Sequence, residues 1–143
     1  MKIISHRGNT KGPFPSKENT LNYILNALVS FDVEIDVRML DNKLMLGHDE
    51  PLHSIDLDFL IDNRESLWVH CKDINSLEFL KNHEINCFSH SSSDFVLSSR
   101  NYILTAPDGP RSANSIVMMP ELSSKPFKGG YLGVITDYPE AYF

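Results

Sequence analysis

Two histidines near the start of the chain are placed where they can transfer protons. His6 ends the first apolar run and precedes Arg7, and His48 lies between Gly47 and Asp49. Imidazole gains and loses a proton near neutral pH, so two such rings can act as a general acid and a general base. Arg7 adds a planar fork of donors that suits phosphate oxygens. Taken alone, a His-Arg pair after a strand is more often part of a surface loop, so this interpretation depends on neighbouring motifs.

Two carboxylates lie two residues apart in the alternating segment 33–40. Glu34 and Asp36 alternate with Val33, Ile35 and Val37. This is the period of a strand, so both carboxylates point to one side of it. On a half-exposed strand they would simply be solvated. Inside a closed sheet an unpaired carboxylate is costly, and a divalent cation would compensate for it. Hard oxygen ligands suit calcium or magnesium.

Further polar residues follow later apolar runs. His70 is either a metal ligand or a buried histidine with satisfied hydrogen bonds, and both interpretations stay open. Lys72 can neutralise phosphate charge, whereas the intervening Cys71 points to the opposite side of a regular strand. His90 and Glu121 stand at the ends of two later strands and are candidates for lining the same site.

Most of these residues stand at the ends of short extended segments, which alternate with helical segments in the first half of the chain. We expect strands at residues 2–6, 33–40, 44–48, 67–71, 85–89, 102–105, 115–119 and 131–136, and helices at 20–30, 57–67 and 75–83. Residues 92–99 are expected to form a short helix or turn. The later connections contain proline and glycine and are expected to be loops.

Strands that alternate with helices indicate parallel βαβ units, and polar strand ends favour a barrel whose catalytic groups converge on one rim. Such barrels typically take roughly 200 to 250 residues, whereas this chain has 143. We therefore expect an α/β fold: a compact, reduced TIM-like (β/α) barrel with several outer helices missing. The first strand should lie beside the last and bring His6 near Asp137. An uncovered barrel wall favours a homodimer.

Length and composition indicate one domain that spans residues 1–143. Apolar residues make up 41% and charged residues 22% of the chain, as in ordinary globular proteins. A net charge of −6 argues against binding to a nucleic-acid backbone. The sequence shows no secretory signal and no membrane-spanning run, and its two cysteines lack the spacing of a disulfide scaffold. We expect a cytoplasmic protein with reduced thiols and no membrane partner.

The order of the motifs resembles that of the glycerophosphodiester phosphodiesterase family, which belongs to the phospholipase-C-like phosphodiesterase barrels. The matching motifs are His6-Arg7-Gly8, Glu18-Asn19-Thr20, Glu34-Ile35-Asp36-Val37, Gly47-His48-Asp49 and Thr136-Asp137-Tyr138-Pro139. Each motif is weak alone. Together, in this order, they indicate a short, divergent member whose activity is metal-dependent hydrolysis of a small phosphodiester, such as a glycerophosphodiester or a related polyol or sugar phosphodiester.

The resemblance implies a role for each matching residue. His6 and His48 would be the general acid and base, and Arg7 would bind phosphate oxygens. The carboxylates Glu34 and Asp36 would hold a divalent metal ion, either magnesium, calcium or manganese, and Glu18 would orient the arginine or complete the metal shell. In the family's mechanism a substrate hydroxyl next to the phosphate attacks first, and water then opens the resulting cyclic phosphate.

One departure from the family pattern concerns the metal. The family usually carries Glu-x-Lys after its third strand, and the glutamate is a metal ligand, whereas this chain has His70-Cys71-Lys72. An imidazole ligand shifts preference from calcium toward manganese, zinc or another transition ion. The departure also favours an alternative, a catalytically weakened phosphate-binding module on the same fold. A phospholipid-cleaving relative is disfavoured because the loops are short and lack an aromatic docking surface.

Overall fold

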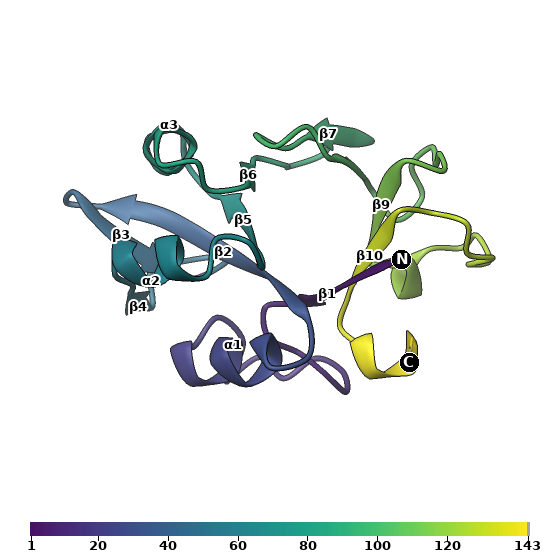
Figure 1. Ribbon diagram of the computed structural model, residues 1–143, viewed down its shortest axis with the longest axis horizontal. Coiled ribbons are helices and arrows are strands. Elements are labelled where there is room, and N and C mark those ends of the chain that lie inside the picture. Colours follow the sequence, from purple (N-terminus) through teal and green to yellow (C-terminus); the bar gives the residue numbers. More distant parts are fainter. Residues whose placement is uncertain (143) are drawn as a thin grey trace.

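The computed structural model describes residues 1–142, and its main feature is one curled, mixed sheet (Figure 1). The strands are β1 (Lys2–His6), β2 (Asp32–Leu40), β3 (Lys43–Leu46), β4 (His53–Ser54), β5 (Leu67–Cys71), β6 (Cys87–Phe88), β7 (Phe95–Leu97), β8 (Ile103–Thr105), β9 (Ser115–Met118) and β10 (Gly133–Thr136). The helices are α1 (Leu21–Leu28), α2 (Leu57–Asp62) and α3 (Ile74–Asn82), with 3-10 turns η1 (Pro120–Leu122) and η2 (Pro139–Tyr142).

Parallel pairing joins the strands in the centre of the sheet. β1 lies between β10 and β2, β5 pairs with the other side of β2, and β6 pairs with β5. On the far side, β9 pairs with β10 and β8 pairs with β9, again in parallel. The first and last strands are therefore neighbours, which confirms their predicted adjacency. Antiparallel pairs are confined to β2–β3, β3–β4 and β7–β8.

The expected reduced TIM-like (β/α) barrel is wrong. The sheet curls into a half-barrel, and within residues 1–142 its ends, β6 and β7, do not pair with each other. The connection between these two strands covers only residues 89–94, whereas a parallel crossover needs about a dozen residues or more. The segment predicted as a short helix or turn at 92–99 contains β7 instead, which pairs antiparallel with β8.

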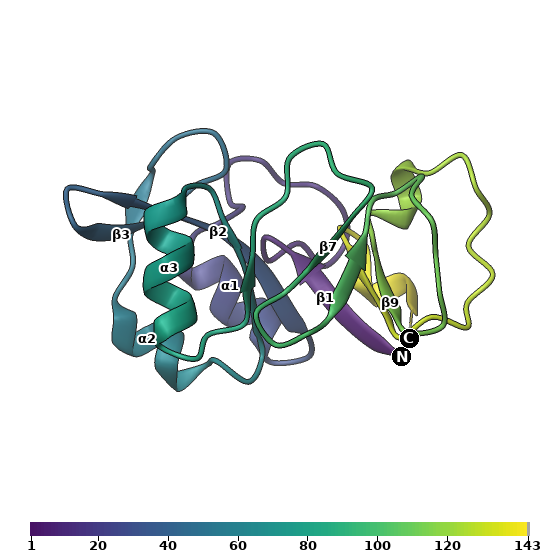
Figure 2. The same ribbon diagram turned by 90° about the horizontal axis from the view of Figure 1, so that it is seen from above.

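The three α-helices all lie beside the half of the sheet that contains β2, β3 and β5 (Figure 2). They confirm the predicted helices, although α2 ends at Asp62, earlier than expected. The other half, around β9 and β10, carries loops and the short turns η1 and η2. Within residues 1–142, no helix has the length and apolar character needed to cross a bilayer.

The alternation along β2 separates an apolar face from a polar one. Val33, Ile35 and Val37 are fully buried in a core cluster that also contains side chains of all three α-helices. The intervening Glu34 and Asp36 are also buried and, by the alternation of the strand, face the opposite, concave side. A second apolar cluster fills that concave side, with Ile4, Trp68, Phe88, Leu104, Ile116, Met118 and Ile135 as members. The carboxylates therefore lie at the edge of a buried apolar region.

Candidate metal and acid–base site

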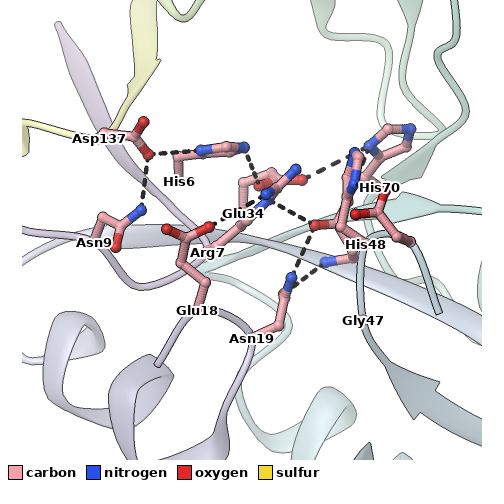
Figure 3. A network of polar contacts seen from close by, with 12 residues as sticks. His6, Arg7, Asn9, Glu18, Asn19, Glu34, Gly47, His48, His70 and Asp137 are labelled. Atoms are coloured by element: carbon pink, nitrogen blue, oxygen red, sulfur yellow. Dashed lines mark hydrogen bonds and ion pairs between the residues drawn. The ribbon is translucent and has the colours of Figure 1, made fainter. Parts of the chain in front are cut away.

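The neighbouring strands β1, β2 and β5 bring four predicted site residues into two adjacent rows. Parallel pairing sets His6 opposite Glu34 and sets Asp36 opposite His70. Paired residues on neighbouring strands face the same side of a sheet. The four side chains consequently meet on the concave face, where polar contacts connect them (Figure 3).

Glu34, Asp36 and His70 form a compact cluster of potential metal ligands, which we call the donor cluster. One ligand atom from each residue lies within 4.8 Å of the others. His70 Nδ1 lies 3.2 Å from Asp36 Oδ1 and 3.9 Å from Glu34 Oε1. The other ring nitrogen, Nε2, lies 3.0 Å from the carbonyl oxygen of His90. The backbone N–H of His90 also points to Nε2, with 3.3 Å between the nitrogens, so Nε2 contacts both a carbonyl oxygen and an N–H while Nδ1 faces the carboxylates. Two carboxylates and an imidazole are ligands that divalent metal ions accept.

Two oxygens of this set are buried without a hydrogen-bond partner among the described residues. They are Glu34 Oε2 and Asp36 Oδ1, and the two residues are only 3% and 0% exposed. Buried polar atoms are normally satisfied, so such oxygens call for a cation or a proton. The trio fits a divalent metal ion and could hold one.

The electrostatics of the two acids are unequal. Burial raises the pKa of Glu34 to about 7, and the adjacent charge of Asp36 adds to the rise. Burial acts in the same direction on Asp36, but the imidazole of His70 next to it and the charge of Arg7 outweigh it and hold its pKa below the usual range. Asp36 is thus an anion at neutral pH, whereas Glu34 loses its proton more readily when a cation is close.

His6 is held in one orientation by the predicted neighbour Asp137. Its Nδ1 lies 2.7 Å from Asp137 Oδ1, and Asn9 Nδ2 donates to the same oxygen over 2.8 Å. Because a carboxylate accepts, Nδ1 carries the hydrogen and Nε2 is left 3.7 Å from Glu34 Oε2. Burial lowers the pKa of His6, but the hydrogen bond to Asp137 and the charge of Glu34 outweigh it, and the pKa lies above its usual value.

Arg7 adopts the left-handed backbone region, with φ of 58°, directly after β1. Its Nε lies 2.9 Å from Asp36 Oδ2, and its NH1 donates to Glu18 Oε1 over 3.2 Å. Glu18 is in turn fixed by the backbone N–H of Phe14. Glu18 was expected either to orient Arg7 or to complete the metal shell. The structure places it against Arg7 and outside the cluster of three potential metal ligands.

Two buried asparagines that the sequence did not single out support the site. Asn19 Nδ2 donates to Asp36 Oδ2 over 2.9 Å, and its Oδ1 accepts the backbone N–H of the same residue. Asn9 supports Asp137, and its own Oδ1 accepts a hydrogen bond from Tyr23. Asn19 lies in the Glu18-Asn19-Thr20 motif, and its positive φ of 58° is one that asparagine tolerates. Its place in that motif is the sequence signal by which it could have been found.

His48 approaches the same cavity from the loop after β3. Its Nδ1 lies 2.7 Å from Asp49 Oδ1, and its side chain is 39% exposed. The guanidinium of Arg38 donates to the carbonyl oxygens of Gly47 and His48, which fixes the loop. Gly47 has φ of 148°, and a Cβ there would lie 1.9 Å from the carbonyl oxygen of Glu50. A glycine is therefore required at this turn.

A cavity of about 170 Å³ connects these groups. It is lined by the ionisable side chains of His6, Arg7, Glu34, His48, His70 and His90 and by the apolar side chains of Phe88, Pro107, Met118, Met119 and Ile135. His90 thus lines the site as expected. Larger hollows lie beside Met1 and along α3, but they are more open and no histidine lines them.

Lys72 and Glu121 do not line this cavity. Glu121 accepts hydrogen bonds from the Thr136 hydroxyl and from the backbone N–H of Asp137, so it fixes the residue that orients His6. Lys72 continues from β5, and its positive charge contributes, after burial and His70, to the lowered pKa of His90. Both residues act on the site indirectly.

Comparisons with known proteins leave the site to be judged on its own geometry. No protein-family model matches this chain. No curated protein and no solved structure gives a significant match either.

Proposed function

We propose that this chain is a metal-dependent phosphodiesterase that hydrolyses a small phosphodiester, in the manner suggested by its glycerophosphodiester phosphodiesterase-like motifs. One observation carries the proposal. An imidazole oriented by a carboxylate, a second imidazole and an arginine line one cavity together with Glu34 and His70, two members of a cluster of three potential metal ligands. Phosphodiester cleavage needs these functions together: neutralisation of phosphate charge and two proton transfers.

Glu34, Asp36 and His70 would hold the metal ion. When bound, a divalent ion supplies positive charge that polarises a phosphoryl oxygen. Arg7 lines the same cavity and is oriented from two sides by Glu18 and Asp36. Its charge adds to the neutralisation of phosphate oxygens without any rearrangement of the side chain.

The two histidines divide the proton transfers. His6 has a raised pKa and a hydrogen on Nδ1 that Asp137 retains, so its Nε2 can carry the proton given to the leaving oxygen. His48 takes the proton from the attacking hydroxyl of the substrate. The attacking oxygen bonds to phosphorus, the bond from phosphorus to the leaving oxygen breaks, and a cyclic phosphate results. Water opens this ring with the two roles exchanged.

The test is an assay of chelator-treated protein with magnesium, calcium or manganese returned separately, using bis(p-nitrophenyl) phosphate and glycerol-containing diesters. We expect hydrolysis that depends on the added ion and is lost in Asp36→Asn. His53→Ala is a matched control, because His53 is exposed on β4 and lines neither the site cavity nor the donor cluster. Tight phosphate binding without turnover of any diester would instead support the catalytically weakened binding module.

A further inference from the structure

The cavity beside His6 has two chemically different walls. Beside the ionisable groups, an apolar wall is made by Phe88, Pro107, Met118, Met119 and Ile135, none of which offers a side-chain hydrogen-bond donor. Phe88, Met118 and Ile135 also belong to the apolar cluster that fills the curl of the sheet. This wall is therefore the part of the inner core that remains accessible from the cavity.

The apolar wall begins directly at the donor cluster. The ring of Phe88 stacks on the ring of His70, with centroids 5.1 Å apart and an angle of 10° between the planes. A group held near His70 in this cavity consequently shares it with an aromatic and two thioether side chains.

The backbone at Met119 is held in an unusual conformation that belongs to this wall. Its φ is 49°, in the left-handed region, which a bulky residue seldom adopts. The Met119 N–H donates to the carbonyl oxygen of Ile135 over 2.7 Å, and Pro120 begins η1 immediately afterwards. Strained residues persist only where the surroundings impose them, and they gather at functional sites. The fold thus maintains this thioether at the cavity.

A second cavity, also of about 170 Å³, lies on the other side of Arg7 and His48, which line both. Its lining includes the carboxylates of Glu18, Asp49 and Glu50. Arg7 and His48, which are suited to contact a phosphate, thus stand between the cavity with the apolar wall and the cavity lined by carboxylates. A phosphodiester seated there would extend one ester group into each.

The geometry points to a phosphodiester with two unlike arms. An alkyl group in the first cavity, against Met119, is the leaving arm. A hydroxyl-bearing arm lies in the second cavity, beside Asp49 and Glu50. This inference rests on the proposed phosphodiesterase function. The polar arm's hydroxyl oxygen forms the new bond to phosphorus, the bond to the apolar arm's oxygen breaks, and that arm departs as an alcohol with the proton from His6. At ~30 Å³ per heavy atom, the cavity holds about six such atoms.

A glycerol arm suits the apolar wall poorly. Its hydroxyls would exchange water for thioether and phenyl groups, which offer no compensating hydrogen bond. An alkyl arm of equal length has no hydrogen bonds to water that it could lose. Each methylene that it buries raises its affinity roughly fourfold.

The experiment compares glycerol phosphate esterified with n-butanol against the same phosphate esterified with a second glycerol. Butoxide is not a better leaving group than glycerol, so a preference for butyl reports binding. We expect kcat/KM for the butyl diester to exceed that for the glycerol diester by roughly tenfold. Met119→Gln should remove the preference, so that the ratio of the two kcat/KM values falls to about one. Met45→Gln on β3 is the matched control, because Met45 lines neither cavity.

Binding of butylphosphonate and methylphosphonate, measured by calorimetry on the manganese-loaded protein, separates this inference from the proposed function. If no diester is hydrolysed but butylphosphonate binds more tightly and Met119→Gln removes the difference, the apolar compartment stands and the phosphodiesterase proposal fails. If diesters are hydrolysed with equal or higher kcat/KM for the glycerol arm, the phosphodiesterase stands and the inference is overturned. Equal affinity for the two phosphonates also overturns it.

Discussion

At the scale of single residues, the site is notable for how few of its polar atoms are free to move. His6 is fixed by Asp137, and Asp137 is fixed by Asn9 and by Glu121. Preorganisation of this kind lowers the reorganisation needed during a reaction. Two carboxylate oxygens of the donor cluster, Glu34 Oε2 and Asp36 Oδ1, have no hydrogen-bond partner among the described residues, and a cation would bind there.

Removal of either imidazole should abolish most turnover while leaving the fold intact. His6→Ala and His48→Ala each delete one proton-transfer group, and neither ring belongs to an apolar core cluster. We expect each variant to lose roughly two to four powers of ten in kcat. The measurement is steady-state hydrolysis of a diester, with circular dichroism to confirm folding. Near-full activity in either variant would show that the acid–base pair is assigned wrongly.

Replacement of Arg7 by lysine should also be poorly tolerated. The guanidinium contacts Asp36 through Nε and Glu18 through NH1 at the same time. An ammonium group is a point charge and cannot reproduce this two-pronged contact. We expect Arg7→Lys to raise KM and lower kcat, whereas Arg100→Lys, far from the site on an exposed ion pair, should change neither. Equal kinetics for the two variants would contradict the role given to Arg7.

At the scale of elements, short connections decide which strands can be parallel and which cannot. α3 lies between β5 and β6 and allows these strands to run in parallel. Its N-cap is Asp73, whose side chain accepts the backbone N–H groups of Ser76 and Met39. The cap therefore joins α3 to β2 and helps to hold the strand that carries Glu34 and Asp36.

Asp73→Ala should lower the free energy of unfolding by about 1 kcal/mol. Burial raises the pKa of Asp73, but the Ser76 hydrogen bonds outweigh it, and the folded-state pKa is lowered from its model-compound value of 3.8. The stabilisation is therefore complete above that value and is lost as pH falls through the folded-state pKa. Urea denaturation of the wild type and of Asp73→Ala at pH 7 and pH 3 measures this. If the difference in unfolding free energy between the two proteins does not shrink at pH 3, the prediction is contradicted. Asp73→Asn, which keeps an uncharged cap, is the control.

Local patterns predicted the elements better than they predicted the closure of the sheet. The alternation around Glu34 and Asp36 correctly indicated a strand with both acids on one face, and the position of His6 at a strand end was also correct. The roles of Asn9 and Asn19 were missed because single amides leave no periodic signal. The barrel expectation failed because the connection between β6 and β7, residues 89–94, is too short for a parallel crossover, and β7 pairs antiparallel with β8 instead.

At the scale of the whole molecule, the uneven distribution of helices leaves part of the sheet without cover. Phe95 and Leu97 on the terminal strand β7 are 60% and 61% exposed, and Ile103 beside them on β8 is 38% exposed. Strand edges with exposed apolar side chains tend to pair with other chains.

We expect a homodimer that covers this edge. Sedimentation equilibrium at increasing protein concentration should show association, and Leu97→Lys should weaken it without changing the circular dichroism spectrum. Val29→Lys is a matched control, since Val29 is 84% exposed beside α1 and away from β7. A monomer at every concentration would contradict the prediction.

The central claim is that Glu34, Asp36 and His70 bind a divalent metal ion, and calorimetric titration of chelator-treated protein with manganese and calcium tests it most directly. The imidazole ligand predicts tighter binding of manganese than of calcium in the wild type, because nitrogen donors suit transition ions better than hard cations. His70→Glu adds a carboxylate at the same place and should reverse that order, whereas His53→Ala should leave it unchanged. If neither ion binds, or if His70→Glu leaves the order of the manganese and calcium affinities unchanged, the account is contradicted.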